Sequence, residues 1–394
     1  MATAPLEAVR MRAVTRVVAL FGGGVALVLG SWTGLARAGM TPGHVLAGAH
    51  GPMMAFGFLG TVIALERAVG ARLRGGALAP VASASGVLWL AGGGAVVVAG
   101  ALFTVAGATV TSIAVRLWRS HTTVDGVVMI TGAVAWTIAA ALWTRGASPV
   151  RLAPVLAAFL VLTIVAERLE LSRLRQPSAA AVTRFVVLLT VFTVGVALTF
   201  VARRVGLAVA GGGLLALTVW LVRFDIARVT IRRAGLPRFA ASAMLAAYGW
   251  SAITGILWVT LAMAPTRPLL HDAAMHALFL GFVVSMVFGH APIVLPAVFR
   301  IPPPSPVLAW LALAVLHTSV AARIVVDLAG STFGRGIATI GKDAATSGAS
   351  ANGVAVGVSA FIPGVSTGTP LPTTDPLTTE DWGEVLDVVD GDTI

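Results

Sequence analysis

Long apolar runs, separated by short connections that carry arginine, fill the first 330 residues of this 394-residue chain. A run of about 20 apolar residues is long enough to cross a bilayer as a helix, whereas a run of about forty must be divided. Gly92, Gly93 and Gly94 divide the one such run, although no charged residue marks the break. The pattern therefore predicts eleven spans, centred on residues 14–35, 43–65, 77–92, 95–116, 124–144, 149–167, 182–202, 205–222, 239–263, 270–294 and 305–328.

The composition agrees with this pattern. Hydrophobic residues make up 57% of the chain and charged residues 11%, and the mean hydropathy is +0.94. An ordinary soluble domain carries about twice that charge. We predict an all-α fold, a polytopic transmembrane helical bundle whose partner is the lipid bilayer. The chain has no cysteine, which excludes disulfides, thiolate metal sites, iron-sulfur clusters and covalently attached c-type haem.

The charges are divided unevenly along the chain. Residues 1–330 hold 25 arginines, no lysine and 8 acids, whereas residues 331–394 hold one arginine, one lysine and 8 acids. Because the arginines lie in connections between apolar runs, we interpret them as orienting a membrane protein and exclude nucleic acid as a partner. With the N-terminus inside, 18 arginines fall on the inner side and 7 on the outer side. The count predicts an integral protein of the inner (cytoplasmic) membrane with a cytoplasmic N-terminus.

The first span also resembles a secretory signal, since Ala36-Arg37-Ala38 is similar to a cleavage site. We favour a retained span, because it is long and continues a membrane domain. The composition changes after Gly330, where Gly, Ala, Ser and Thr dominate and Pro370 and Pro372 follow. We predict a transmembrane domain at 1–330 and a low-complexity tail at 331–394, disordered or truncated and without chemistry of its own.

A weak internal repeat ends two of the inner helices. Glu66-Arg67 and Glu167-Arg168 each follow an apolar run that begins with Thr and contains Ile-Ala or Ile-Val-Ala. The simplest interpretation is a pair of interfacial ion pairs with the arginine reaching toward water. A relic of duplication and a proton entry point are the alternatives.

Histidine inside a membrane is costly unless it is paired or ligating, so each one is a candidate for function. His50 and His276 each lie about 10 Å below the outer interface, given a helical rise of about 1.5 Å per residue. Two imidazoles at one depth on different helices are what a haem with two axial histidines requires. Met53 and Met54 are alternative soft ligands. The alternative to ligation is that both histidines bond a carbonyl or a threonine of a neighbouring helix.

The other histidines offer weaker sites. His44 and His271 lie near the outer mouths of their helices and are either interfacial or ligating, and His121 is predicted to be solvated. His290 lies about 21 Å deeper than His276 and with His317 could form a second site on the inner side, for copper or iron. The alternative is that His290 caps a helix broken by Pro292 and Pro296, while His317 bonds a backbone carbonyl.

Two segments resemble a known family. Gly48-Ala-His50-Gly-Pro-Met-Met-Ala-Phe-Gly-Phe is similar to the second helix of haem-copper oxidase subunit I, and Leu270-His271-Asp272-Ala-Ala-Met-His276 resembles its tenth helix. The resemblance implies that His50 and His276 ligate a low-spin haem near the outer face. The copper ligands of that family are missing, because the chain has no histidine between residues 122 and 270.

The NnrS-like group is the closer fit. His276-Ala-Leu-Phe-Leu-Gly-Phe, followed by Gly289-His290, is similar to a helix of that group, whose members have about twelve spans and contain haem and copper. The resemblance implies a non-covalent b-type haem, a copper ion, and a link to the nitric oxide response or to respiratory redox chemistry. It also implies a small gas ligand, NO or O2, and an electron donor.

The leading hypothesis is therefore an integral membrane haem-binding protein that also binds copper, with arginines neutralising the propionates. Whether it is an enzyme is left open. The alternative is a proton- or ion-coupled transporter without a redox cofactor, in which Asp272, Asp225 and Glu66 form a relay. A true terminal oxidase or nitric oxide reductase is disfavoured by the missing copper ligands.

Overall fold

The computed structural model describes the backbone of residues 4–37, 47–71, 73, 75–264, 268–299 and 305–346. Side chains are described in residues 17–36, 48–71, 73, 75–173, 175–264, 269–292 and 305–329. His44, the tail from residue 347 onward and the N-terminal side chains lie outside these ranges.

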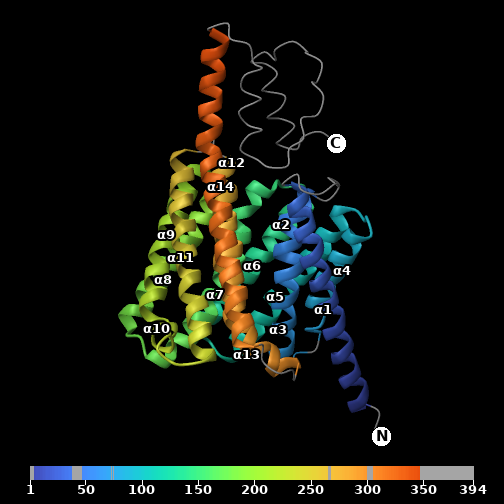
Figure 1. The fold of residues 1–394 in the computed structure, drawn as a ribbon. Coiled ribbons are helices and arrows are strands. Elements are labelled where there is room, and N and C mark those ends of the chain that lie inside the picture. The colour runs from blue at the N-terminus through green and yellow to red at the C-terminus, as the bar shows by residue number, and fades with distance from the viewer. Residues whose placement is uncertain are drawn as a thin grey trace. The chain divides into compact units, whose positions relative to one another are not determined.

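The described backbone consists of helices joined by short turns and contains no strand, which confirms the predicted all-α fold (Figure 1). The helices in chain order are α1 (Ala4–Arg37), η1 (Ala47–Ala49), α2 (His50–Pro52), η2 (Met53–Gly60), α3 (Thr61–Ala71), α4 (Leu78–Ala91), α5 (Val96–Ser120), α6 (Val124–Thr144), α7 (Pro149–Ser172), η3 (Arg173–Arg175), α8 (Ala179–Leu198), α9 (Arg203–Phe224), α10 (Ala227–Thr230), α11 (Leu236–Met263), α12 (Pro268–His276), η4 (Ala277–Val284), α13 (Ser285–Phe299) and α14 (Pro306–Thr346).

The described residues contain ten helices that are long and apolar enough to cross a membrane, together with the shorter apolar helix α4. Each of them coincides with one of the predicted spans. The predicted break at the triple glycine is confirmed: Gly93 adopts a positive φ of 80°, and the Trp89 indole donates to the Ala95 carbonyl across the turn. The 14 residues of α4 cover about 21 Å, so this helix is shorter than the hydrocarbon core.

The chain divides into two units between Ile324 and Val325, within α14. The predicted boundary at residue 330 falls inside α14, which continues to Thr346. Residues 331–346, the first of the predicted tail, are thus helical, because Gly330 costs a helix only about 1 kcal/mol and no proline follows before Pro363.

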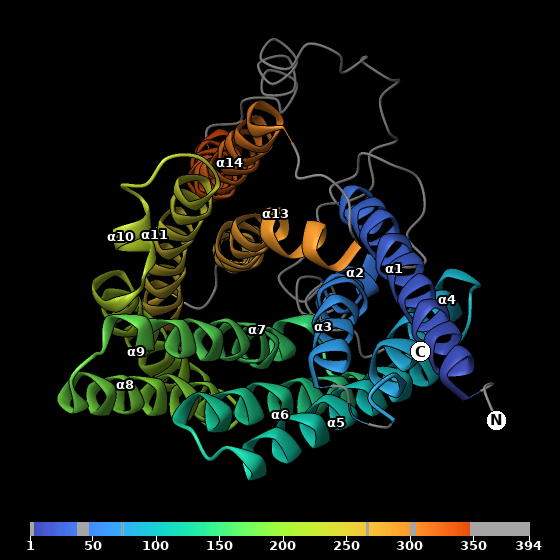
Figure 2. The same cartoon turned by 90° about the horizontal axis from the view of Figure 1, so that it is seen from below.

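Within residues 1–324, neighbouring helices in the sequence are mostly neighbours in space. Helices α4, α5, α6 and α7 pack in sequence, as do α8, α9 and α11, and α7 connects the two sets. Figure 2 shows α7 along one side of the interior and α13 between α11 and the helices α1 and α2. Apolar side chains such as Val28 and Val219 are 68% exposed on the outside, which suits contact with lipid.

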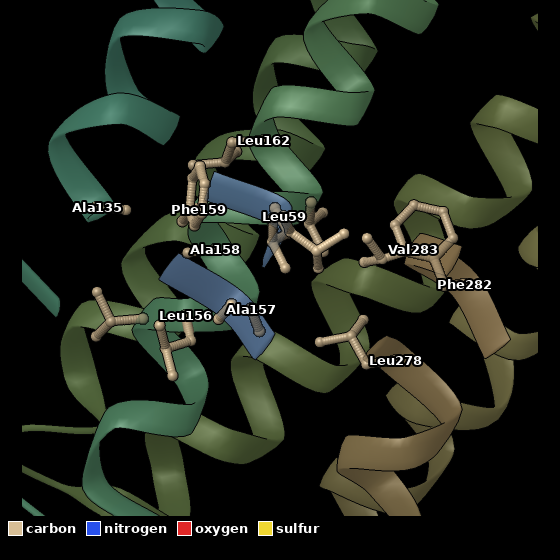
Figure 3. Close-up of a cluster of buried hydrophobic side chains, with 14 of the residues drawn as sticks. Leu59, Ala135, Leu156, Ala157, Ala158, Phe159, Leu162, Leu278, Phe282 and Val283 are labelled. Atoms are coloured by element: carbon tan, nitrogen blue, oxygen red, sulfur yellow. The ribbon is translucent and has the colours of Figure 1, made fainter. Parts of the chain in front are cut away.

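The core joins both sets of helices. Leu59 of η2 and Leu278, Phe282 and Val283 of η4 approach α7, where Phe159 is buried among alanine and leucine side chains (Figure 3). The two π-helical segments therefore meet the same central helix.

Close helix crossings depend on glycine, and one pair of glycines gives a matched test. A methyl group on Gly195 of α8 would lie 2.3 Å from the Ala210 backbone nitrogen of α9, whereas one on Gly212 would meet nothing within 4 Å. We expect Gly195→Ala to lower the free energy of unfolding by about 1–3 kcal/mol through overpacking. Gly212→Ala is expected to be neutral or to stabilise by up to about 1 kcal/mol, because alanine favours helix. Thermal unfolding in detergent measures both, and equal melting temperatures would contradict the α8–α9 crossing.

Candidate functional site

His50 is the first residue of α2, and its imidazole lies against α1. Its Nδ1 atom is 2.7 Å from the carbonyl oxygen of Gly30, which also accepts a hydrogen bond from the Thr33 hydroxyl at 2.8 Å. A methyl group on Gly34 would lie 2.8 Å from Cε1 of His50. The ring position therefore requires glycine at residue 34.

Met54 lies one helical turn after His50 and also faces α1. A methyl group on Gly30 would lie 2.5 Å from the Met54 sulfur. The half-buried thioether and the imidazole thus occupy neighbouring places on the same helix. The structure places both predicted ligands of this segment together.

His276 is the last residue of α12, and its Nδ1 atom lies 2.8 Å from the carbonyl oxygen of Asp272, one turn earlier. In His276 as in His50, Nδ1 faces a carbonyl and therefore carries the proton, which puts the lone pair on Nε2. This is the tautomer of a histidine that ligates through Nε2 and donates its other N–H to a carbonyl. A purely structural histidine bonded to a carbonyl, the alternative interpretation, makes the same contact.

A second feature distinguishes these two histidines. Each is followed within three residues by an eight-residue π-helical segment, η2 after His50 and η4 after His276. π-Helix is rare and occurs frequently at functional sites. These two π-helical segments set the two histidine-bearing spans apart from the other spans.

Glycine and phenylalanine occupy the same places in both π segments. Gly57 and Gly281 are each the fifth residue and are followed by Phe58 and Phe282. Each glycine permits close packing: a methyl group on Gly57 would lie 2.7 Å from Val87, and one on Gly281 would lie 2.5 Å from the Trp250 ring. Thus η2 packs closely against α4, and η4 packs closely against α11.

The surroundings of the two histidines belong to one buried cluster. Ala49 and Met53 beside His50, and Ala273 and Ala277 beside His276, are all members of it. Further along the same two segments, Figure 3 shows the side chains of Leu59, Leu278 and Val283 pointing toward one another. We call these three side chains the apolar floor.

His290 of α13 has a different environment. Its Nδ1 atom lies 2.6 Å from the Met286 carbonyl oxygen, and its Nε2 atom lies 3.1 Å from a guanidinium nitrogen of Arg168. Because arginine only donates, Nε2 of His290 accepts, and the imidazole is neutral with both nitrogens engaged. In this arrangement Nε2 of His290 cannot ligate a metal. The helix also runs through Pro292 and Pro296 to Phe299, so the alternative of a cap on a broken helix is wrong.

Arg168 belongs to a buried polar cluster that the sequence did not predict. Its guanidinium and the carboxylate of Asp225 are each 1% exposed and lie 3.7 Å apart. Asp225 Oδ2 accepts a hydrogen bond of 2.7 Å from the Tyr248 hydroxyl, and Oδ1 accepts one from the Ala227 amide. A guanidinium nitrogen of Arg168 also donates to the sulfur of Met244, at 2.9 Å. We define Arg168, Asp225, Tyr248 and His290 as the inner polar cluster.

The Glu-Arg repeat forms one pair across two helices. Arg67 of α3 pairs with Glu167 of α7, and neither pairs with its own sequence neighbour. Arg168 points inward, so its interpretation as an arginine reaching toward water is wrong. Asp225 was already a relay candidate from the sequence, whereas the single tyrosine, Tyr248, in an apolar run was the signal that the sequence analysis did not use.

His317 of α14 accepts a hydrogen bond of 2.9 Å from the Trp250 indole and stacks on its ring. The partner of His317 is thus a side chain and not the backbone carbonyl of the alternative interpretation. His271 is half-buried in α12, and His121 is exposed at the end of α5, as predicted. Within the part of the chain that the structure describes, no three His, Asp or Glu side chains form a group that could hold a metal ion.

Comparison with known proteins adds a family. Residues 16–357 match the family described as a domain of unknown function (DUF8744), which accounts for most of the chain. No curated protein and no solved structure matches the chain. The similarity to NnrS-like proteins and to haem-copper oxidase subunit I stays a prediction from the sequence.

Proposed function

We propose that this chain, which belongs to the DUF8744 family, is an integral membrane haem-binding protein in which His50 and His276 ligate one non-covalent b-type haem. The proposal places the protein in the cytoplasmic membrane with its N-terminus inside, and links it to nitric oxide or respiratory redox chemistry. An electron donor and a diatomic gas, NO or O2, are the proposed partners.

One observation carries the proposal. The two histidines selected by depth and by resemblance each precede a π-helical segment of eight residues, and each directs Nδ1 at a backbone carbonyl. Nε2 of each ring thus carries the lone pair that iron requires.

The residues of the chain support this chemistry in distinct ways. The carbonyls of Gly30 and Asp272 fix the two imidazoles and raise the basicity of their Nε2 atoms. Gly34 leaves room for the ring of His50, and the apolar floor of Leu59, Leu278 and Val283 would exclude water. A haem held by two imidazoles would supply one-electron exchange, and NO or O2 could bind the iron only after one of the two histidines had left it.

The described contacts do not extend this proposal to copper at His290 and His317. Nε2 of His290 accepts from Arg168, and Nδ1 of His317 accepts from Trp250. A copper ion therefore stays a prediction from the sequence alone.

The absorption spectrum of the detergent-purified protein, oxidised and dithionite-reduced, tests the proposal together with iron analysis. We expect a Soret band, sharp α and β bands on reduction, and one iron per chain. A folded protein that is colourless and free of iron would dismiss haem binding.

Proton- or ion-coupled transport is a second candidate, favoured by the inner polar cluster. Ionisable side chains that are 1% exposed within a membrane domain commonly mark ion pathways, and Glu66 lies within electrostatic range of His290. Proteoliposomes containing a pH-sensitive dye test this candidate. Transport predicts proton flux that Glu66→Gln reduces, whereas flux equal to that of empty vesicles would dismiss it.

A further inference from the structure

A cavity of about 680 Å³ opens where α11 and α14 begin, away from the two histidines of the proposed haem site. It is lined by Gly235, Leu236, Arg238, Phe239, Pro292, Ser305, Pro306, Ala309 and Trp310. Its walls are largely apolar, with one arginine at the opening. The cavity thus combines a cationic group with space for a hydrocarbon chain.

Arg238 is the one charged residue among the described residues that line this cavity, and further arginines lie before it in the sequence. Arg228, Arg232, Arg233 and Arg238 are all exposed in the α10–α11 region. None of the described residues that line the cavity is Asp or Glu. The surroundings of Arg238 are therefore complementary to an anion.

The helix ends add to this potential. Two long helices, α11 and α14, begin at the cavity, and the start of a helix carries a partial positive charge. Gly235, which precedes α11, provides no side-chain cap, and the first turn of α11 contains no acid. A phosphate group at this place would meet favourable charge from Arg238 and from both helices.

The apolar walls fit a lipid chain. The rings of Phe239 and Trp310 meet edge to face at 5.3 Å, and Leu313 and Ala243 continue the same small cluster deeper between α11 and α14. Trp310 is 42% exposed, as is common for tryptophan at a membrane interface. Basic pockets between transmembrane helices are known binding places for anionic lipid headgroups.

We propose that this cavity binds an anionic phospholipid, with the phosphate at Arg238 and one acyl chain between Phe239, Ala309 and Trp310. The site is independent of haem binding. It makes the arginine-rich end of the α11–α14 pair selective for anionic over zwitterionic lipid.

Native mass spectrometry of the full-length protein in detergent tests the proposal. The probes are phosphatidylglycerol, phosphatidylcholine with the same acyl chains, and glycerol phosphate, which has the headgroup without the chains. We expect retention of phosphatidylglycerol in preference to phosphatidylcholine. Arg238→Gln should weaken it about five-fold, since each arginine near an anionic headgroup contributes on the order of 1 kcal/mol.

Two further variants complete the design. Arg119→Gln removes an exposed arginine in the last turn of α5, which does not line the cavity, and should leave lipid binding unchanged. Ala309→Trp fills the cavity without altering charge and should abolish lipid retention. Because Arg238 is exposed, we expect Arg238→Gln to fold. If Ala309→Trp does not fold, Arg238→Gln alone tests the proposal.

Three results would overturn the proposal. Equal retention of the two lipids, or equal weakening by Arg238→Gln and Arg119→Gln, would show general surface attraction. Glycerol phosphate that competes as well as the lipid would show a free phosphate site. A dimer in lipid-free detergent that Ala309→Trp disrupts would show that a second copy occupies the cavity.

Discussion

Replacing either His50 or His276 by alanine is expected to lower the haem content of the purified protein more than about tenfold, because losing even a supporting contact of a ligand costs that much. Each variant removes one of the two proposed iron ligands while leaving the apolar floor in place. The haem-to-protein ratio, from the Soret absorbance and the protein absorbance of one sample, measures the effect.

The matched control is His121→Ala, since His121 is exposed at the end of α5 and far from both π segments in the sequence. It should retain full haem content. Met54→Leu tests whether Met54, and not His50, ligates the iron, because this variant removes the thioether and keeps the imidazole. Full haem in both histidine variants would reject the ligand assignment, and loss only in Met54→Leu and His276→Ala would replace His50 by Met54.

Removing the charge of Asp225 is expected to destabilise the protein by about 3–5 kcal/mol, because Asp225→Asn leaves the buried Arg168 without its carboxylate. The hydrogen bond from Tyr248 would also lose its charged acceptor. Thermal unfolding in detergent, followed by the fraction of protein that remains monodisperse, measures the change.

Asp125→Asn is the comparison, because Asp125 pairs with Arg173, whose side chain is 52% exposed. An exposed pair is worth less than about 1 kcal/mol, so this variant should melt close to the wild type. The double variant Arg168→Met with Asp225→Asn should recover part of the stability, since neither charge is then buried alone. Equal effects of Asp125→Asn and Asp225→Asn would contradict the buried position of the inner polar cluster.

The spans could be predicted because bilayer thickness fixes the length of a transmembrane helix, and each predicted run coincides with an apolar helix. The break at Gly93 was also accessible, since a forty-residue apolar run cannot cross a membrane once. The length of α14 was not, because composition marked a change at Gly330 while a single glycine does not end a helix.

The site was predictable in part. Helical rise alone placed His50 and His276 at one depth, and both lie beside π-helical segments in the structure. The π segments themselves could not be predicted, because their apolar residues fit an α-helix equally well. The two segments share a Gly-Phe pair, Gly57-Phe58 and Gly281-Phe282. This pair can be linked to π-helix only once the structure shows that both segments are π-helical.

The inner polar cluster shows the limit of reading one sequence. Arg168, Asp225 and His290 lie far apart along the chain and meet because α7, the end of α9 and α13 converge. Local patterns carry no information on that convergence. Arg168 therefore resembled an interfacial arginine, and His290 resembled a metal ligand, until their mutual contact was known.

Pulsed electron paramagnetic resonance (electron spin echo envelope modulation) of the oxidised full-length protein, prepared with nitrogen-15 histidine, tests the central claim most directly, since it counts the imidazoles bound to ferric iron. The account predicts a low-spin ferric signal with hyperfine coupling from two labelled imidazoles. A ferric signal coupled to a single imidazole, or no haem signal from folded protein, would contradict it.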